Sequence, residues 1–273
     1  MNKGMMKGMS NEDYHAHQSI SKSQLDMVSV DPYRVQWSKD CPQDAEKLAT
    51  FDFGDAMHAI CLEPDRLESE FIVMPSFNLR SNAGKEEKAA FVKEHEGKKL
   101  LTADEGKKLH LMFDSVMAHP EARAIIDAEG IAESSWFWTD SDTGQDCRCR
   151  PDKLIDNRLI DVKTTEQLSK FAFSVDDYRY YVQDPFYCDG LAANGIDSPS
   201  MAFLVIQKHI EIGRYPVMVV RLPEEAIEYG RLQYKADLRK YADFLDSGKS
   251  EIDELPMSFR FMERAYESLE VIL

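Results

Sequence analysis

The sequence lacks any apolar run long enough to cross a membrane. Such a span needs about 20 consecutive apolar residues, and none of that length occurs among the 273 residues. The first ten residues include lysines but no apolar segment, so they do not read as a secretory signal. From these absences we expect a cytoplasmic protein with no membrane partner.

Cysteine is scarce and irregularly spaced. The chain has five cysteines, an odd number, at positions Cys41, Cys61, Cys147, Cys149 and Cys188. The Cys147-x-Cys149 pair has no second pair after it, so it cannot complete a four-ligand zinc site. We therefore expect reduced thiols, as is usual in a cytosolic protein.

Basic residues are also in short supply. There are 33 Lys and Arg against 49 Asp and Glu, which gives a net charge of -16. Binding to nucleic acid normally needs a basic surface, so this balance weighs against a DNA-binding protein. Basic residues gathered on one face would remove the objection, and so would metal ions that neutralise acidic groups. The segment 80–108, with eight basic and six acidic residues, shows that the charge is uneven.

The order of predicted elements indicates one α/β domain with a mixed sheet. Helices come first, followed by three strands, a helix, two strands and a long helix that begins after Pro223. We predict a single domain over residues 1–273, with a loosely ordered N-terminal arm at 1–19 and a core sheet within 131–222. The predicted strands are 133–138, 147–154, 159–164, 201–207 and 217–222, and the predicted helices include 49–62 and 178–193.

The segment from Arg150 to Lys163 carries the strongest chemical signal. Alternate residues of a strand point to the same face, so Asp161 and Lys163 project together while Val162 turns into the core. Asp152 begins the preceding hairpin and lies within reach of Asp161 if the two strands pair. Two carboxylates bind a hard cation such as Mg²⁺ through oxygen, and Lys163 can orient a water molecule there. The alternative is a surface salt pair worth about 0–1 kcal/mol.

Three further features strengthen the interpretation. Glu133 begins the strand before the hairpin and offers another oxygen ligand, unless it is an exposed carboxylate at a strand end. Gly54 and His58 are one helical turn apart, and His58 is either a metal ligand or a core histidine. Gln183 and Tyr187 share a helix face at i, i+4 and can hold a phosphate, a base edge or the lysine, unless they are ordinary helix surface.

Taken in chain order, these motifs resemble the RecB-like branch of the PD-(D/E)xK nuclease superfamily. The motifs are Gly54-x-x-x-His58, Glu133, Pro151-Asp152, Asp161-x-Lys163 and Gln183-x-x-x-Tyr187. Wider stretches resemble the nuclease domain of RecE-type exonucleases, namely residues 10–15, 20–25, 82–87, 147–153, 161–165 and 178–190. The resemblance implies an α/β fold with a restriction-endonuclease-like core, in which helices flank a central mixed β-sheet.

The resemblance also implies an activity and a set of site residues. RecE-type enzymes need Mg²⁺ and degrade linear double-stranded DNA from its 5′ ends, leaving 3′ single-stranded overhangs for recombination. They form tetrameric rings and work with a RecT-like single-strand annealing protein. By this resemblance Lys163 is the catalytic lysine. The implied metal ligands are His58, Asp152, Asp161 and the carbonyl of Val162, and the supporting residues are Glu133, Gln183 and Tyr187.

A ring would also accommodate the acidic charge, because its channel can be basic while its outside is acidic. The candidate DNA-binding residues are Arg80, Lys85, Lys88, Arg148 and Arg150, each of which is otherwise a solvated surface charge. No cysteine follows Cys188, so we predict no iron–sulfur cluster. The sequence leaves open whether the metal ion is Mg²⁺ or Mn²⁺. It also leaves open two other functions for the same core: an endonuclease or single-strand nuclease, and a non-catalytic module that binds DNA ends.

Overall fold

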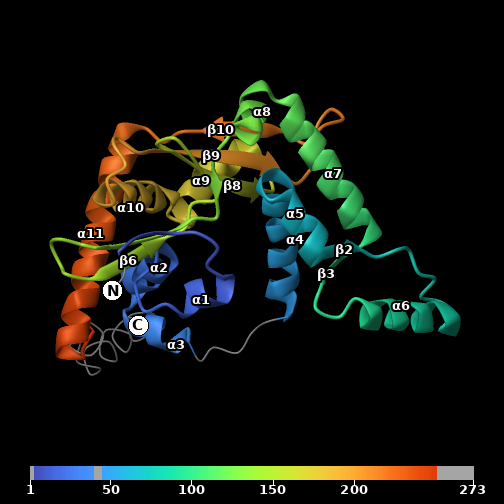
Figure 1. Cartoon of the computed structure of the whole chain (residues 1–273), viewed down its shortest axis with the longest axis horizontal. Helices are drawn as coiled ribbons and strands as arrows, with labels where there is room; N and C mark the ends of the chain where they lie inside the picture. The colour runs from blue at the N-terminus through green and yellow to red at the C-terminus, as the bar shows by residue number, and fades with distance from the viewer. Residues whose placement is uncertain (1–2, 40–44, 251–273) are drawn as a thin grey trace, which may run out of the picture.

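The computed structural model describes residues 3–39 and 45–250 of the chain. At its centre is a five-stranded mixed sheet with the strand order β10-β9-β8-β7-β4 and helices on both faces (Figure 1). Neighbouring strands are antiparallel except for β8 and β9, which run parallel. These strands are β4 (Ile131–Ala132), β7 (Lys153–Ile155), β8 (Arg158–Thr165), β9 (Ser200–Gln207) and β10 (Val217–Val220). The predicted fold class, an α/β restriction-endonuclease-like core around a mixed sheet, is confirmed.

The central strands β8 and β9 are buried on both faces. Leu159 of β8 belongs to one hydrophobic cluster, whereas Ile160 and Val162 belong to the cluster on the other face. This alternation follows from the two-residue period of a strand. It places Asp161 and Lys163 on the same face as Leu159.

Helices from different parts of the chain cover the two faces. The face with Leu159 packs against α2 (Lys22–Val30), α10 (Tyr180–Ala193) and α11 (Glu224–Ser247). The face with Val162 packs against α4 (Ala45–Leu62), α7 (Ala103–Ala118) and α8 (Pro120–Asp127). The remaining helical segments are α1 (Asn11–Ala16), α3 (Tyr33–Trp37), α5 (Pro64–Glu70), α6 (Asn82–Glu94), η1 (Leu168–Lys170) and α9 (Phe171–Asp177). Within the described residues, no helix is both long and apolar enough to span a membrane.

Two smaller sheets complete the fold. The antiparallel sheet β1-β5-β6 consists of β1 (Gly4–Met6), β5 (Ser135–Thr139) and β6 (Asp146–Cys149). The parallel pair β2 (Phe71–Val73) and β3 (Lys99–Leu101) carries α6, which projects away from the central sheet (Figure 1).

The N-terminal segment is a correction to the sequence interpretation. We expected residues 1–19 to form a loosely ordered arm, but β1 pairs with β5 and α1 follows it. Ser10 accepts a hydrogen bond from the backbone of Asp13 at the start of α1, and Tyr14 is buried. Backbone pairing with a distant strand is a long-range contact, which local composition does not reveal.

One predicted strand is divided between two sheets, and another begins before the observed strand does. Residues 147–154 form the end of β6 in one sheet and the start of β7 in the other, with Pro151 between them. Residues 133–138 likewise begin outside β5, because Glu133 has a φ of 47° and lies between β4 and β5. Glu133 and Asp152 therefore lie where the chain passes from one sheet to the other, and the Glu133 amide donates to the Asp152 carbonyl at 3.0 Å.

Candidate active site

Asp161 and Lys163 lie side by side on β8, as strand alternation predicts. Asp161 is 3% exposed, and its Oδ2 lies 2.6 Å from Lys163 Nζ. Its other oxygen, Oδ1, accepts a hydrogen bond from Gln183 Nε2 at 2.5 Å. Asp161 is thus held between its own strand and α10.

Asp152 comes within reach through the tight turn between β7 and β8. Asp156 at that turn has a φ of 54°, and the register then pairs Lys153 with Ile160. Asp152, one residue earlier, points its Oδ2 at the Val162 amide, which donates to it at 2.6 Å. The predicted proximity of Asp152 to the Asp161–Lys163 strand is confirmed.

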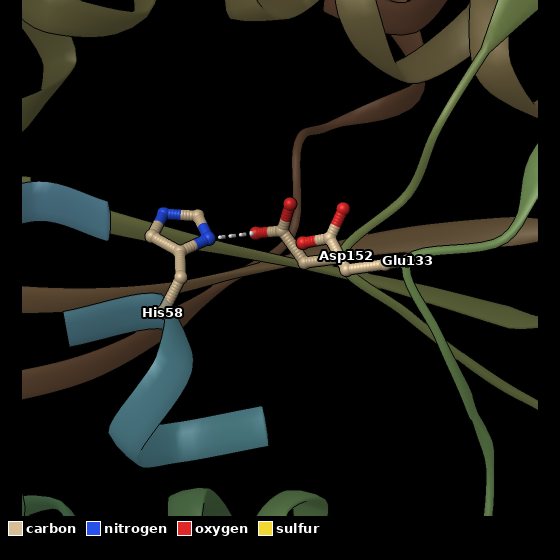
Figure 2. Close-up of side chains that lie close together, drawn as sticks. All are labelled: His58, Glu133 and Asp152. Atoms are coloured by element: carbon tan, nitrogen blue, oxygen red, sulfur yellow. Dashed lines mark ion pairs between the residues drawn. The ribbon is translucent and has the colours of Figure 1, made fainter. Parts of the chain in front are cut away.

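A candidate metal site forms around Asp152. One ligand atom each from His58, Glu133 and Asp152 lies within 4.8 Å of the others. His58 comes from α4 and Glu133 from the β4–β5 junction, and Figure 2 shows both side chains turned toward Asp152. His58 Nδ1 is 3.0 Å from Asp152 Oδ2. Glu133, expected as a supporting residue, is therefore placed among the candidate ligands.

The cluster brings several carboxyl groups close to one histidine, and burial and these neighbours shift the pKa of each group. Burial, with the neighbouring Asp152 carboxylate, raises the pKa of Glu133 to about 8. Burial alone would lower the pKa of His58, but the Asp152 carboxylate outweighs it and raises that pKa to about 9. Burial likewise raises the pKa of Asp161. At Asp152 burial acts in the same direction, but His58, Lys163 and the Val162 amide together outweigh it and lower the pKa. Such a cluster attracts positive charge.

The residues fit a divalent cation by their chemistry. Carboxylate oxygens are ordinary ligands for Mg²⁺ or Mn²⁺, whereas the single imidazole nitrogen is a ligand more typical of softer divalent metals. Asp161 Oδ2, although close to Lys163, is buried and has no hydrogen-bond partner of normal geometry. An oxygen in that position is suited to an additional cation, because buried acceptors are otherwise almost always satisfied.

A cleft of about 830 Å³ opens over these residues. Its lining includes Glu133, Asp152, Asp161 and Lys163, together with Gln183 and Tyr187 of α10. The structure therefore brings the predicted carboxylates, lysine, glutamine and tyrosine into one cleft. His58 joins them through its contact with Asp152. Val162 contributes its amide to Asp152, and its side chain is buried on the opposite face.

The predicted DNA-binding residues are not brought together. Arg150 lines the cleft, where it bonds to Ser135 and Asn11. The prediction that Arg148 contacts DNA is wrong. Arg148 is 2% exposed and donates to the His17 carbonyl at 2.6 Å, so it cannot reach a phosphate group. Strand alternation gives the face of β6 on which Arg148 lies, but it does not reveal that the N-terminal segment covers that face.

The other three candidates lie far from the cleft in the chain's architecture. Arg80 precedes α6, and Lys85 and Lys88 are on it. Arg80 and Lys85 are exposed and Lys88 is half-buried. Figure 1 shows α6 at the end of the molecule away from α10 and α11. They stay predicted DNA contacts, and within one chain α6 lies away from the helices that flank the cleft (Figure 1).

Two further cleft residues lie outside the predicted set of catalytic and metal-binding residues. Lys22 Nζ lies in the cleft and donates to the Tyr178 carbonyl at 2.5 Å. Tyr180 places its ring centroid 4.7 Å from Lys163 Nζ, a cation–π contact. Tyr180 lies three residues before Gln183 on α10. The i, i+3 spacing of a helix could therefore have predicted that the two side chains share a face.

Four of the five cysteines lie in the described part of the chain. Cys61, Cys147, Cys149 and Cys188 are buried free thiols. Burial raises the pKa of each above its ordinary value, which keeps the thiols neutral. Cys41 lies outside the described residues.

Comparison with known proteins identifies a shared fold and a family. A structure from Eubacterium rectale, described as a candidate exonuclease, superposes with a TM-score of 0.57 over 86% of each chain at 8% identity, which shows a shared fold. No curated protein matches the sequence. The family model of the PDDEXK-like domain of unknown function (DUF3799) matches residues 33–251. The chain therefore belongs to this family of PDDEXK-like domains, within the PD-(D/E)xK nuclease superfamily.

Proposed function

We propose that this protein is a Mg²⁺-dependent deoxyribonuclease that hydrolyses phosphodiester bonds in the cleft above Asp152, Asp161 and Lys163. The observation that carries the proposal is the placement of His58, Glu133 and Asp152 as a ligand group beside the Asp161–Lys163 pair. A structural salt pair would need neither the third carboxylate nor the histidine, and each buried charge has a desolvation cost.

Each residue has a role that its position supports. Asp152, Asp161, His58 and Glu133 would hold the cation, which polarises the phosphodiester and lowers the pKa of a bound water molecule. Lys163 carries a proton, because burial alone would lower its pKa but the neighbouring Asp161 and Asp152 carboxylates and Tyr180 together raise it. It therefore acts as a fixed positive charge that stabilises negative charge in the transition state.

Gln183 and Tyr187 act on this group from α10. Gln183 donates to Asp161 and fixes the direction of its carboxylate. Tyr187 is one helical turn further along and lines the same cleft. We propose that Gln183 positions the metal ligand and that Tyr187 contacts the DNA.

The finer part of the proposal is a 5′→3′ exonuclease on linear double-stranded DNA that leaves 3′ overhangs. Its support is the ordered series of motifs that resemble those of RecE-type exonucleases, together with the cleft lined by Glu133, Asp152, Asp161, Lys163, Gln183 and Tyr187. We also propose a tetrameric ring and a RecT-like annealing partner. Light scattering should then give four times the mass of the 31.3 kDa chain.

The test is cleavage of end-labelled linear duplex DNA with Mg²⁺ and with EDTA. We expect nucleotides to be released from 5′ ends with Mg²⁺ only, and a covalently closed circle to stay intact. Asp161→Asn and Lys163→Gln should each lower kcat at least 100-fold, the scale for loss of a transition-state electrostatic contact. Asp243→Asn, an exposed carboxylate on α11, is the matched control.

The results also separate the alternatives. Cutting of the circle would assign endonuclease action, and preference for unpaired strands would assign a single-strand nuclease. DNA-end binding with no metal-dependent cleavage of any DNA, equal in the parent and in Asp161→Asn, would replace the proposal with a non-catalytic binding module.

A further inference from the structure

Three aromatic rings stack from the core outward to one wall of the cleft. Phe203 of β9 is fully buried, and its ring stacks on Tyr180 with centroids 5.5 Å apart and planes 27° apart. Tyr180 stacks in turn on Tyr178, with centroids 5.7 Å and planes 25° apart. Tyr178 is 61% exposed. The series therefore ends in an uncovered aromatic face at the cleft.

This series of rings runs beside the catalytic lysine. The Tyr180 ring, its middle member, lies 4.7 Å from Lys163 Nζ. Tyr178 lines the same cleft as Asp152 and Asp161. A planar group stacked on the exposed face of Tyr178 would thus lie in the same cleft as these residues.

Tyr178 is held in this place by its neighbours. The next residue, Arg179, adopts a left-handed backbone conformation with a φ of 50°, which is strained for a residue with a side chain. Its guanidinium donates to Asp237 Oδ2 at 2.6 Å, and Lys22 donates to the Tyr178 carbonyl. Strain of this kind persists only where surrounding contacts enforce it, and it concentrates at functional sites. A tyrosine that is merely on the surface needs no such support.

Stacking would also let an acidic protein bind DNA without relying on attraction between charges. A chain with a net charge of -16 gains little from general attraction to phosphates. Contact between an aromatic side chain and a base is independent of charge and of sequence, because every base has a flat face.

We propose that Tyr178 is the stacking platform for an unpaired nucleobase at the end of the DNA strand that enters the cleft. The inference rests on the proposed nuclease function and names the part of its substrate that this wall binds. An unpaired base is required, because a base within a duplex has both faces covered by its neighbours.

The experiment combines abasic substrates with variants of Tyr178. Linear duplexes carry a short unpaired 5′ end, with a single abasic site at each of the first four nucleotides in turn. With the parent protein, we expect one position at which the abasic site lowers kcat/KM about tenfold, equivalent to about 1.4 kcal/mol. Tyr178→Ala should show the same loss on intact DNA and no further loss at that position.

Matched variants separate stacking from general damage. Tyr178→Trp should keep the discrimination between normal and abasic DNA. Tyr229→Ala, an exposed tyrosine on α11 outside the cleft lining, should behave as the parent. Tenfold discrimination that persists in Tyr178→Ala would overturn the inference, and so would a parent that discriminates at none of the four positions.

A binding measurement keeps this test separate from that of the function. Fluorescence of 2-aminopurine at the same position is recorded with Ca²⁺ in place of Mg²⁺. Quenching by the parent and by Tyr178→Trp, absent in Tyr178→Ala, would support stacking even if the parent cleaves no DNA. Equal quenching in all three would reject Tyr178 as the platform while leaving nuclease activity intact.

Discussion

Asp184 is a buried carboxylate with little to offset its charge. It is 2% exposed, its Oδ2 has no hydrogen-bond partner, and its Oδ1 receives only a long bond, 3.5 Å, from the Cys188 thiol. Burial raises the pKa of Asp184 to about 6, against an ordinary value of 3.8. The folded state therefore binds the proton more tightly than the unfolded chain does.

Asp184→Asn should stabilise the protein at neutral pH. A raised pKa in the folded state favours folding below about pH 4, and that contribution is lost as the pH rises through about 6. The variant should exceed the parent in unfolding free energy by up to about 3 kcal/mol at pH 7, and by nothing near pH 3.5. Urea unfolding across this range measures the difference. Asp176→Asn, which is exposed on α9, should show no such trend, and a constant difference at Asp184 would refute the account.

Residues set by strand alternation were predictable from the sequence, and residues set by long-range contact were not. Asp161, Lys163 and Val162 lie as a two-residue period requires. Glu133 was expected at the start of a strand, but it lies in a left-handed turn between two sheets and thereby joins the ligand group. The prediction that Arg148 contacts DNA is wrong because the N-terminal segment, far away in sequence, covers this residue.

Among the secondary-structure elements, α10 and α11 pack with unusually close backbones. A Cβ atom at Gly230 of α11 would lie 1.7 Å from the Tyr181 carbonyl oxygen of α10. Only a residue without a side chain permits this approach. The contact matters for the site, because α10 carries Gln183 and Tyr187.

Gly230→Ala should destabilise the protein, although alanine favours helix. Overpacking of a tight contact costs about 1–3 kcal/mol, which exceeds the gain of up to about 1 kcal/mol in helix propensity. Gly54→Ala on α4 is the matched control, because a Cβ atom at Gly54 would have no neighbour within 4 Å among the described residues. Urea unfolding should show opposite signs for the two variants. A stabilised Gly230→Ala would contradict the packing.

The elements themselves were largely predictable, and their sheet membership was not. The strands at 159–164, 201–207 and 217–222 were predicted close to their bounds in β8, β9 and β10. Residues 147–154 were expected as one strand, because all of them are compatible with extended structure. The chain instead changes sheets around Pro151, which has no amide hydrogen to continue a ladder. That change positions Asp152, so the feature that the sequence did not reveal is the one that builds the site.

For the whole molecule, the main question is how an acidic chain binds a polyanion. The cleft is lined by basic side chains, but Lys22 is paired with Asp26, and Lys163 is paired with Asp161. The helix α6, which carries exposed basic residues, lies away from the central sheet (Figure 1). We infer that duplex DNA approaches along α6 before its end enters the cleft.

Reversing two charges on α6 tests this path. Lys85→Glu combined with Lys88→Glu should weaken duplex binding and reduce the slope of log K against log salt by about 2, because about 0.9 of a counterion is released per phosphate contact. Lys107→Glu with Lys249→Glu changes the net charge equally at other exposed positions and is the control. Equal salt slopes in both double variants would remove α6 from the DNA path.

The central claim is that His58, Glu133 and Asp152, next to Asp161, hold a divalent metal ion. Anomalous diffraction from crystals soaked in Mn²⁺ tests it most directly. The account predicts a peak bounded by His58, Glu133 and Asp152, which disappears in Asp152→Asn crystals of the same form. A fully soaked crystal with no peak there, or a peak that survives the substitution, would contradict it.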